Sequence, residues 1–221
     1  MTTNDLGYDL IENFIFQSEL TAILEETKAA LLSEKGGGIR NAEKKFRTIL
    51  AFAQSSRVIK CAERFLSGQP QLARAILFNK RPGKNWLVTW HQDKTIALSS
   101  RFNKSGWGPW SLKDGAHCVQ PPSHVLDNMI ALRVHLDEST AANGALKLIP
   151  GSHNRGILNQ EQIDQFLATR DAITIEAPRA SALAMRPLIL HASSKAHIPT
   201  TRRVLHLEYS AAELPAGVTW A

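Results

Sequence analysis

The character of the sequence changes near Pro70, and this change limits the folds that are open to the chain. Between Gln17 and about Ser33, apolar residues recur every three or four positions among charged ones, which is the period of an amphipathic helix. A second helical stretch runs from about Ser55 to Leu66 and ends at a Ser-Gly-Gln-Pro turn. After Pro70 the chain consists of short apolar runs separated by turn residues. This order predicts an α+β protein that is mainly β.

The runs after Pro70 that are expected to be strands share short length and apolar character. They are Leu72–Asn79, Trp86–Trp90, Met129–Leu136, Ala145–Ile149, Ala172–Ile175, Ser181–Met185 and Val204–Tyr209. A further short strand is expected at Gly7–Ile11. Many short strands favour a two-sheet sandwich or a jelly roll, the double-stranded β-helix. Between two of the runs, Asn143-Gly144 predicts a type I′ hairpin turn.

The chain is expected to form a single domain over residues 1–221, because no linker or internal repeat divides it. Residues 1–70 would be its mainly helical part, and residues 71–210 its jelly-roll core with an insert at about residues 99–125. Long irregular segments are usually functional or disordered, and the aromatic residues of this insert argue against disorder. Two interpretations stay open: a lid over the site, or a stable surface excursion with its own small cluster.

Composition excludes few classes of protein. The chain is 43% hydrophobic and 21% charged, and its net charge of +6 comes from scattered basic residues. We expect a small-molecule substrate and no nucleic-acid partner, since an anionic small molecule explains this excess equally well. No apolar run reaches the roughly 20 residues of a membrane span, and the N-terminus does not resemble a signal peptide. Cys61 and Cys118 are expected to be free thiols, so a cytoplasmic location is predicted. The oligomeric state is left without a prediction.

Two histidines and one aspartate form a candidate metal site. His91 and Asp93 follow an expected strand, and residues two apart on an extended chain point to the same side. His191 ends the short apolar run Pro187–Leu190, where it is well placed to face a cavity. Two histidines with one carboxylate form the facial triad of non-haem Fe(II) oxygenases. Each of these residues taken alone is more often an ordinary structural one.

An arginine follows the second histidine closely enough in sequence to bind a charged group of a cosubstrate, if that cosubstrate is held at the metal by its other end. Arg202 lies eleven residues after His191, and its planar fork matches a carboxylate. Ser193 lies on the side of His191 and can add a hydroxyl hydrogen bond. Because neighbouring residues of a strand face opposite sides, only one of Arg202 and Arg203 can enter a cavity.

Several short motifs, in order and at similar spacing, resemble the phytanoyl-CoA dioxygenase family. They are Trp90–Asp93, Asn143–Leu146, Ile149–His153, His191–Ser193 and Arg202-Arg203. The resemblance implies a double-stranded β-helix core with the N-terminal helices packed on one sheet. It also implies a dioxygenase that uses Fe(II), 2-oxoglutarate and O2. By this resemblance His91, Asp93 and His191 would bind iron, and Arg202 with Ser193 would bind the distal carboxylate of 2-oxoglutarate.

The same resemblance suggests further residues around the cosubstrate. Arg133 falls where family members place a side chain that contacts it, although the family often has an aromatic residue there. Ile76, Phe78 and Lys80 lie on one face of the strand before the metal motif and by resemblance would line the same pocket, with an exposed position as the alternative for Lys80. Arg40 is a further candidate for the other carboxylate. Candidate substrate contacts come from the insert: Trp107, Trp110 and Lys113.

The resemblance implies hydroxylation of an unactivated C–H bond of a small molecule, with release of succinate and CO2. Halogenating relatives replace the carboxylate ligand with a small residue, so the presence of Asp93 favours hydroxylation. Desaturation and ring closure stay open, and so does the identity of the substrate. A non-catalytic jelly-roll protein that binds a metal or ligand is the alternative. A Zn(II) hydrolase is disfavoured, because no general base lies close to the ligands in sequence.

Overall fold

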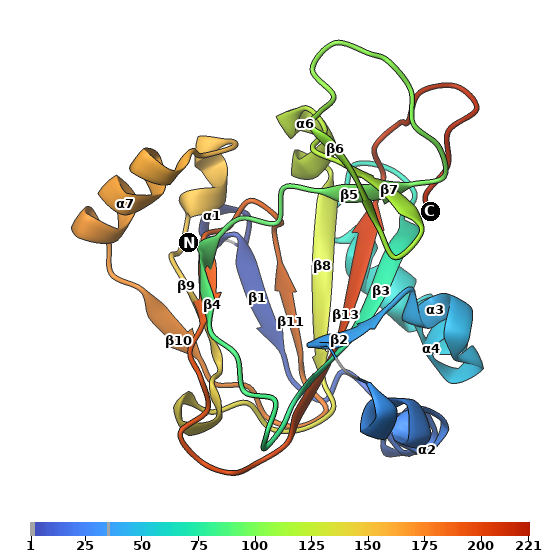
Figure 1. Cartoon of the computed structure of the whole chain (residues 1–221), viewed down its shortest axis with the longest axis vertical. Helices are drawn as coiled ribbons and strands as arrows, with labels where there is room; N and C mark the ends of the chain where they lie inside the picture. The colour runs from blue at the N-terminus through green and yellow to red at the C-terminus, as the bar shows by residue number, and fades with distance from the viewer. Residues whose placement is uncertain (1–2, 35) are drawn as a thin grey trace.

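Two antiparallel sheets form the core of the computed structural model, which describes residues 3–34 and 36–221 (Figure 1). The larger sheet has the order β1 (Tyr8–Ile11), β11 (Ala182–Met185), β8 (Met129–His135), β13 (Arg202–Ser210), β3 (Gln71–Lys80) and β2 (Gly38–Arg40). The smaller sheet has the order β10 (Ile173–Ile175), β9 (Leu146–Leu148), β12 (His191–Ser193) and β4 (Val88–His91). Buried residues of both sheets, among them Leu146, Leu148, Leu183 and Met185, form one apolar cluster. The two sheets therefore pack against each other.

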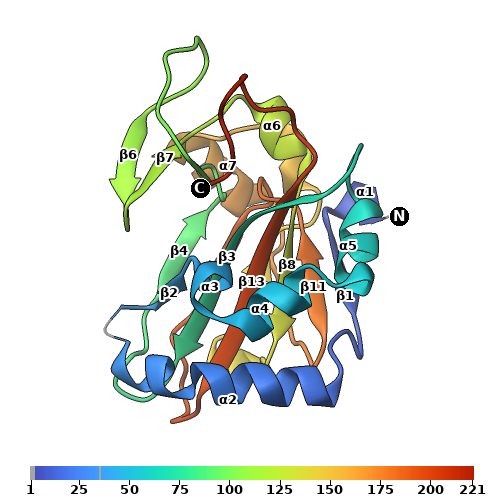
Figure 2. The same ribbon diagram turned by 90° about the vertical axis from the view of Figure 1, so that its right-hand side faces the viewer.

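Helices of the N-terminal part cover the outer face of the larger sheet, as Figure 2 shows for the helices in blue and cyan. They are α2 (Gln17–Ser33), α3 (Ala42–Lys45), α4 (Arg47–Ala53) and α5 (Ser56–Glu63). The remaining helices are α1 (Thr3–Leu6), α6 (Ser123–Asp127) and α7 (Gln160–Thr169), with 3₁₀ turns η1 (Ala141–Asn143) and η2 (Ser152–Arg155). None of the helices in the described ranges has the length and apolar character that crossing a bilayer requires.

Strand β13 shows how alternation separates the apolar core from the site. Leu205, Leu207 and Tyr209 point to the helices and are buried in the outer core, where the Tyr209 hydroxyl donates to the carbonyl of Ala53 at 2.7 Å. The intervening side chains, including Arg202 and His206, face the other sheet and line a cavity. One strand thus contributes both to the core that stabilises the fold and to the polar interior.

The sequence predicted the main helices and strands to within a few residues. The helix from Gln17 and the strand near Gly7 are confirmed as α2 and β1. The second helical stretch appears as α5, but α3, α4 and β2 were missed because each is short. Since β1 and β2 both join the larger sheet, the mainly helical N-terminal part also provides its two edge strands.

The predicted hairpin at Asn143-Gly144 is wrong. Asn143 ends η1, where its backbone N–H and its side chain bond with Thr140, and Gly144 takes the left-handed conformation at φ 79°. Strand β9, which follows, pairs with β10 and β12 and not with β8. The turn carries the chain from one sheet to the other, so the two strands that flank it never become partners.

The insert is more regular than its composition suggested. It contains the antiparallel pair β6 (Trp110–Lys113) and β7 (Ala116–Val119), which joins β5 (Ile96–Leu98) in a three-stranded sheet. The ring of Phe102 lies 5.0 Å from that of Trp107 and 5.1 Å from that of Trp110. These aromatic residues pack against a buried apolar cluster beside the C-terminal segment. The arrangement favours the surface excursion, and a lid role stays a prediction.

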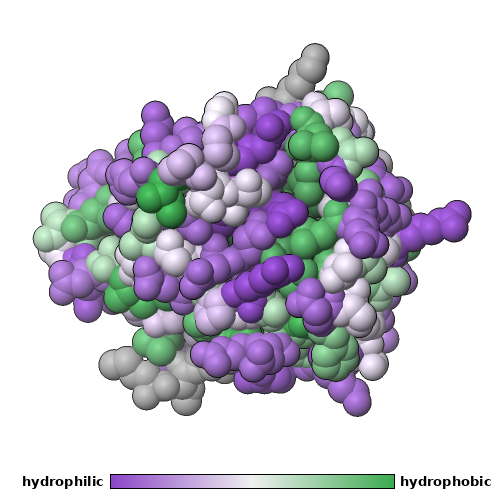
Figure 3. Space-filling model, turned by 90° about the horizontal axis from the view of Figure 1, so that it is seen from below, coloured by the Kyte–Doolittle hydropathy of each residue, from purple (hydrophilic) through white to green (hydrophobic). Residues whose placement is uncertain are grey.

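The surface seen from below is mainly hydrophilic, with small hydrophobic groups between the polar ones (Figure 3). Exposed large apolar residues occur at separate places in the chain: Phe16, Leu32, Leu50, Leu87, Leu112 and Ile198. Such scattered residues are ordinary on a protein surface and need no partner to explain them.

Candidate active site

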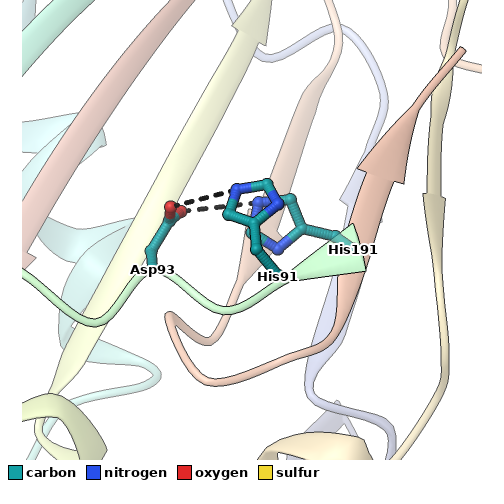
Figure 4. A group of neighbouring side chains, drawn as sticks. All are labelled: His91, Asp93 and His191. Carbon is teal, nitrogen blue, oxygen red and sulfur yellow. Dashed lines mark ion pairs between the residues drawn. The ribbon is translucent and has the colours of Figure 1, made fainter. Parts of the chain in front are cut away.

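Three potential metal ligands meet where β4 and β12 run side by side. His91 ends β4 and is the cross-strand partner of His191, the first residue of β12. Asp93 follows two residues after His91, and its carboxylate lies 3.6 Å from Nε2 of each histidine (Figure 4). One donor atom from each residue lies within 4.8 Å of the other two. The structure thus brings together the three residues that the sequence singled out.

The hydrogen bonds of the two histidines leave the correct nitrogen free for a metal. Nδ1 of His91 contacts the carbonyl of Thr89 at 2.8 Å, and Nδ1 of His191 contacts the carbonyl of Ile189 at 2.9 Å. A carbonyl only accepts, so both Nδ1 atoms carry the hydrogen and both Nε2 atoms keep a lone pair. This pattern of outer hydrogen bonds is typical of metal-binding histidines. The residues therefore fit an Fe(II) ion.

Burial and mutual contact set the charge of these groups. Burial alone would raise the pKa of Asp93, but His191 and His91 hold that pKa well below its usual range. Burial lowers the pKa of His191 to about 4. Burial also disfavours the charged form of His91, but the Asp93 carboxylate outweighs it and raises the pKa of His91. Asp93 is thus an anion, and His191 is a neutral donor, over the ordinary pH range.

A cavity of about 210 Å³ lies between the two sheets and reaches the three residues. Its lining combines apolar and charged side chains: Arg74, Ile76, Phe78, Lys80, Trp86, Val88, His91, Asp93, Arg133, Leu146, His191, Ser193, Arg202, His206 and Glu208. The predicted contacts Arg202, Ser193, Arg133, Ile76 and Phe78 are all among them.

Two cations and a hydroxyl group gather at one end of the cavity. Ser193 Oγ donates to the carbonyl of Gly144 at 2.8 Å, so it accepts from Lys80 Nζ at 3.2 Å and Arg202 Nη2 at 3.5 Å. Lys80 also donates to the carbonyl of Ser194 at 2.7 Å. The buried Nε of Arg202 has no hydrogen-bond partner among the described residues. Such an orphaned donor beside a second cation suits a carboxylate ligand.

Burial makes these charges costly. Burial, together with the charges of Arg202 and Arg133, lowers the pKa of Lys80 to about 8. Burial, with Arg133, lowers the pKa of Arg202 to about 10. An anion bound at this end would relieve both shifts.

A chain of polar residues lines the cavity on the side of the larger sheet. Arg133 has no acceptor atom, so its Nη1 donates to Nδ1 of His206 at 3.2 Å, and His206 Nε2–H donates to Glu208 at 3.2 Å. Arg74 closes the chain with an ion pair to Glu208 at 2.6 Å. Burial would raise the pKa of Glu208, but Arg74 and His206 hold it below its usual value. Glu208 is therefore charged and balances Arg74.

Comparison with known proteins gives the family. The family model described as phytanoyl-CoA dioxygenase matches residues 4–204. The chain belongs to the phytanoyl-CoA dioxygenase family. A curated relative from Stutzerimonas stutzeri, named a probable alpha-ketoglutarate-dependent hypophosphite dioxygenase, is 23% identical over 244 residues. That match covers 95% of this chain and 76% of the relative.

Solved structures confirm the fold of this phytanoyl-CoA dioxygenase family member. The alpha ketoglutarate dependent epimerase SnoN from nogalamycin biosynthesis has a TM-score of 0.73 and 14% identity, over 97% of this chain and 81% of its own. EctD from S. alaskensis with 2-oxoglutarate and 5-hydroxyectoine has a TM-score of 0.71 and 16% identity, over 95% and 73%. The predicted jelly-roll core is therefore confirmed.

The family and the relatives identify the protein as a 2-oxoglutarate-dependent non-haem iron dioxygenase that acts on small molecules. Its cofactor is Fe(II), and its cosubstrates are 2-oxoglutarate and O2. These were the class of enzyme and the cofactors that the sequence predicted.

Some candidates in this family member lie outside the cavity. Trp107 and Trp110 belong to the cluster of the insert, and Lys113 is exposed, so none of the three lines the cavity. Arg40 is exposed and pairs with Asp114 at 3.1 Å, which contradicts its suggested contact with the cosubstrate.

No prediction from the sequence included Arg74, His206 and Glu208 in the site, and the place of Lys80 was left open. A usable signal was present. Each lies an even number of residues from a predicted cavity residue on the same strand, since His206 and Glu208 follow Arg202 and Arg74 precedes Ile76. Alternation alone places them on the inner face.

Proposed function

We propose that the enzyme hydroxylates an unactivated C–H bond of a small molecule and releases succinate and CO2. The observation that carries this proposal is the open side of the His91, Asp93 and His191 group, which faces a cavity with cations at its far end. Three protein ligands leave room around an iron ion for a chelating oxo acid and O2. When bound, the iron supplies the redox chemistry that couples oxidation of 2-oxoglutarate to oxidation of the substrate.

The far end of the cavity would hold the distal carboxylate of 2-oxoglutarate. Arg202 offers its fork, Ser193 adds the hydroxyl that fixes it, and Lys80 adds a second positive charge. Ile76 and Phe78 line the path between this end and the metal ligands, where they would exclude water. Arg133, stacked over Phe78 at 5.6 Å from the ring centroid, would contact the cosubstrate beside the iron. The chain thus orients the cosubstrate with its two acidic ends apart.

The intact carboxylate of Asp93 supports hydroxylation over halogenation. Its two oxygens already lie at 3.6 Å from the two histidines, so the third ligand position is filled by the protein. A halide has no vacated carboxylate position to occupy.

A second candidate is oxidation of a small phosphorus oxyanion. It is supported by the curated relative, whose name assigns it to hypophosphite, and by the cations of the cavity. A non-catalytic metal-binding jelly roll, the alternative from sequence, would form the same three-residue group and release no succinate.

A product assay separates these functions. The enzyme, supplied with Fe(II), 2-oxoglutarate and O2, is screened for succinate release against small molecules with and without C–H bonds. We expect at least one C–H compound to give one hydroxylated product per succinate. Succinate release with phosphorus oxyanions alone would favour the second candidate. Tight ligand binding without any release of succinate would establish that the protein is a non-catalytic binding protein and would contradict the proposal.

The affinity for 2-oxoglutarate should depend on pH through Lys80. The charged form of Lys80 attracts a carboxylate, and its pKa in the free protein is about 8. Below this pH Lys80 is protonated, so affinity should be constant. Above it, affinity should fall by at most about tenfold per pH unit, because binding then requires uptake of a proton. Calorimetry under anaerobic conditions at pH values from about one unit below this pKa to about one and a half units above it measures the profile.

Two variants test that assignment. Lys80→Met should bind 2-oxoglutarate more weakly at pH 7 and lose the decline above pH 8. Lys113→Met, which changes an exposed lysine outside the cavity, should keep the wild-type profile. If the decline persists in Lys80→Met, another group is responsible for it.

A further inference from the structure

The charges of the cavity do not balance when the cofactors are counted, and this imbalance bears on the substrate. The two charges of Fe(II) and that of Arg202 are offset by Asp93 and the two carboxylates of 2-oxoglutarate. Arg74 is offset by Glu208, with which it pairs. Lys80 and Arg133 remain, and neither forms an ion pair within the described ranges 3–34 and 36–221. Uncompensated buried cations are costly, so a further anion is expected in the site.

Arg133 is the residue of this pair that lies beside the metal ligands. It lines the cavity together with the three ligand residues, and its hydrogen-bond partner His206 lies with Asp93 along this cavity and along a second small pocket. Lys80 lies at the other end, where Ser193 and the carbonyl of Ser194 already bind it. The unbalanced charge near the reacting position is therefore that of Arg133.

The guanidinium of Arg133 is held in place before any ligand arrives. One N–H donates to His206, which is fixed by Glu208, and the guanidinium carbon lies 5.6 Å from the Phe78 ring centroid. Its Nε is buried without a hydrogen-bond partner in the described part of the chain. Since arginine has five N–H donors, those left over suffice for the iron-side carboxylate of the cosubstrate and for a second oxyanion.

The space available sets the size of that anion. The cavity measures about 210 Å³ before the cosubstrate enters, below the roughly 300–1,000 Å³ of typical small-molecule sites. Since 2-oxoglutarate would take up part of this volume, the space beside Arg133 favours a compact anion.

We infer that the substrate is a small oxyanion, either an inorganic one or a short carboxylate, whose charged oxygens bind Arg133 while its reactive bond faces the metal. This inference rests on the 2-oxoglutarate-dependent oxidation that both candidate functions share, and it adds the substrate class and its recognition residue. A carboxylate would agree with C–H hydroxylation, and an inorganic oxyanion would agree with the second candidate. A neutral molecule of the same shape would leave the charge of Arg133 uncompensated, so discrimination between the two should be large.

Binding to the anaerobic complex with Fe(II) and 2-oxoglutarate tests the inference. Hypophosphite, propionate and neutral propionamide are titrated by calorimetry, while the visible band of the iron complex reports retention of the cosubstrate. We expect at least one of the two anions to bind with the band retained, and propionamide to bind at least about tenfold more weakly. Binding of hypophosphite alone would indicate an inorganic substrate, and binding of propionate a carboxylate.

Variants assign the effect to one arginine. Arg133→Gln should weaken anion binding by at least about tenfold, Arg133→Lys should weaken it less, and Arg203→Gln should leave it unchanged. Arg203 is the matched control because it pairs with Asp137 at 2.7 Å outside the cavity. The comparison of propionate with propionamide uses the wild-type protein and does not depend on folding of a variant.

Several results would overturn the inference. It fails if neither anion binds while the band forms, if propionamide binds as well as propionate, or if the anions displace 2-oxoglutarate. It also fails if Arg133→Gln loses 2-oxoglutarate but keeps wild-type affinity for the anion. Absence of the band in the wild-type protein would overturn the proposed function together with the inference.

Discussion

His91→Ala is expected to remove the weak visible charge-transfer band that anaerobic Fe(II) and 2-oxoglutarate give with the wild-type protein. His91 supplies one of three donor atoms that lie within 4.8 Å of one another. Loss of a residue that only orients a ligand already costs about 10–100-fold in metal affinity, so loss of a ligand should cost more. Succinate release should fall to background for the same reason. Absorption spectroscopy and Fe(II) titration measure both effects.

The fold should survive this change. The His91 side chain is 37% exposed and lies at the end of a strand, so its removal leaves no large cavity in the core. His124→Ala, which changes an exposed histidine in α6, is the matched control and should keep the full band. A normal band in His91→Ala, with an unchanged melting curve, would place the iron elsewhere.

Arg202→Ala is expected to raise the 2-oxoglutarate requirement by at least about 30-fold. Removal of one member of a buried, hydrogen-bonded charge pair costs about 2–5 kcal/mol, and every 1.4 kcal/mol is tenfold in affinity. Arg202 is buried beside Ser193, and its Nε–H, which has no partner among the described residues, is free to donate to a carboxylate. Lys80 stays in place, so residual binding should persist. Succinate formation against 2-oxoglutarate concentration gives the apparent KM.

Arg203→Ala provides a demanding control because it alters the next residue of the same strand. Arg203 forms a fork-to-carboxylate pair with Asp137, with two contacts of 2.7 Å, on the other face of β13. Its loss should lower the melting temperature slightly and leave the apparent KM for 2-oxoglutarate unchanged. Equal effects of the two substitutions would show that Arg202 does not hold the distal carboxylate.

Residues near one another in sequence were the most predictable part of the site. His91 and Asp93 follow a strand two positions apart, and extended backbone geometry puts them on one side. Arg202 and Arg203 are assigned to opposite faces by the same rule, and the structure places Arg202 in the cavity and Arg203 against Asp137. Short-range geometry was enough in both cases.

Predictions failed where the outcome depended on which distant segment lies alongside. Asn143-Gly144 has the local chemistry of a hairpin turn, yet the strands it joins belong to different sheets. The tryptophans of the insert pack with Phe102 in a cluster of their own, one of two arrangements that the sequence left open, and their contact with a substrate stays a prediction. In both places the outcome was decided by which apolar side chains pack together in the folded protein. The local sequence pattern does not encode that packing.

The sequence by itself determined the sheet-rich architecture, the two histidines and the aspartate as candidate ligands, and the face on which each residue of β13 lies. Only the tertiary structure decided that Arg133, His206, Glu208 and Arg74 form one chain, because they come from three strands that meet through long-range pairing. The periodicity of a strand fixes the face of each side chain. The order of the strands in the sheet and their register depend on the packing of the whole core. They bring four cationic side chains into one small cavity.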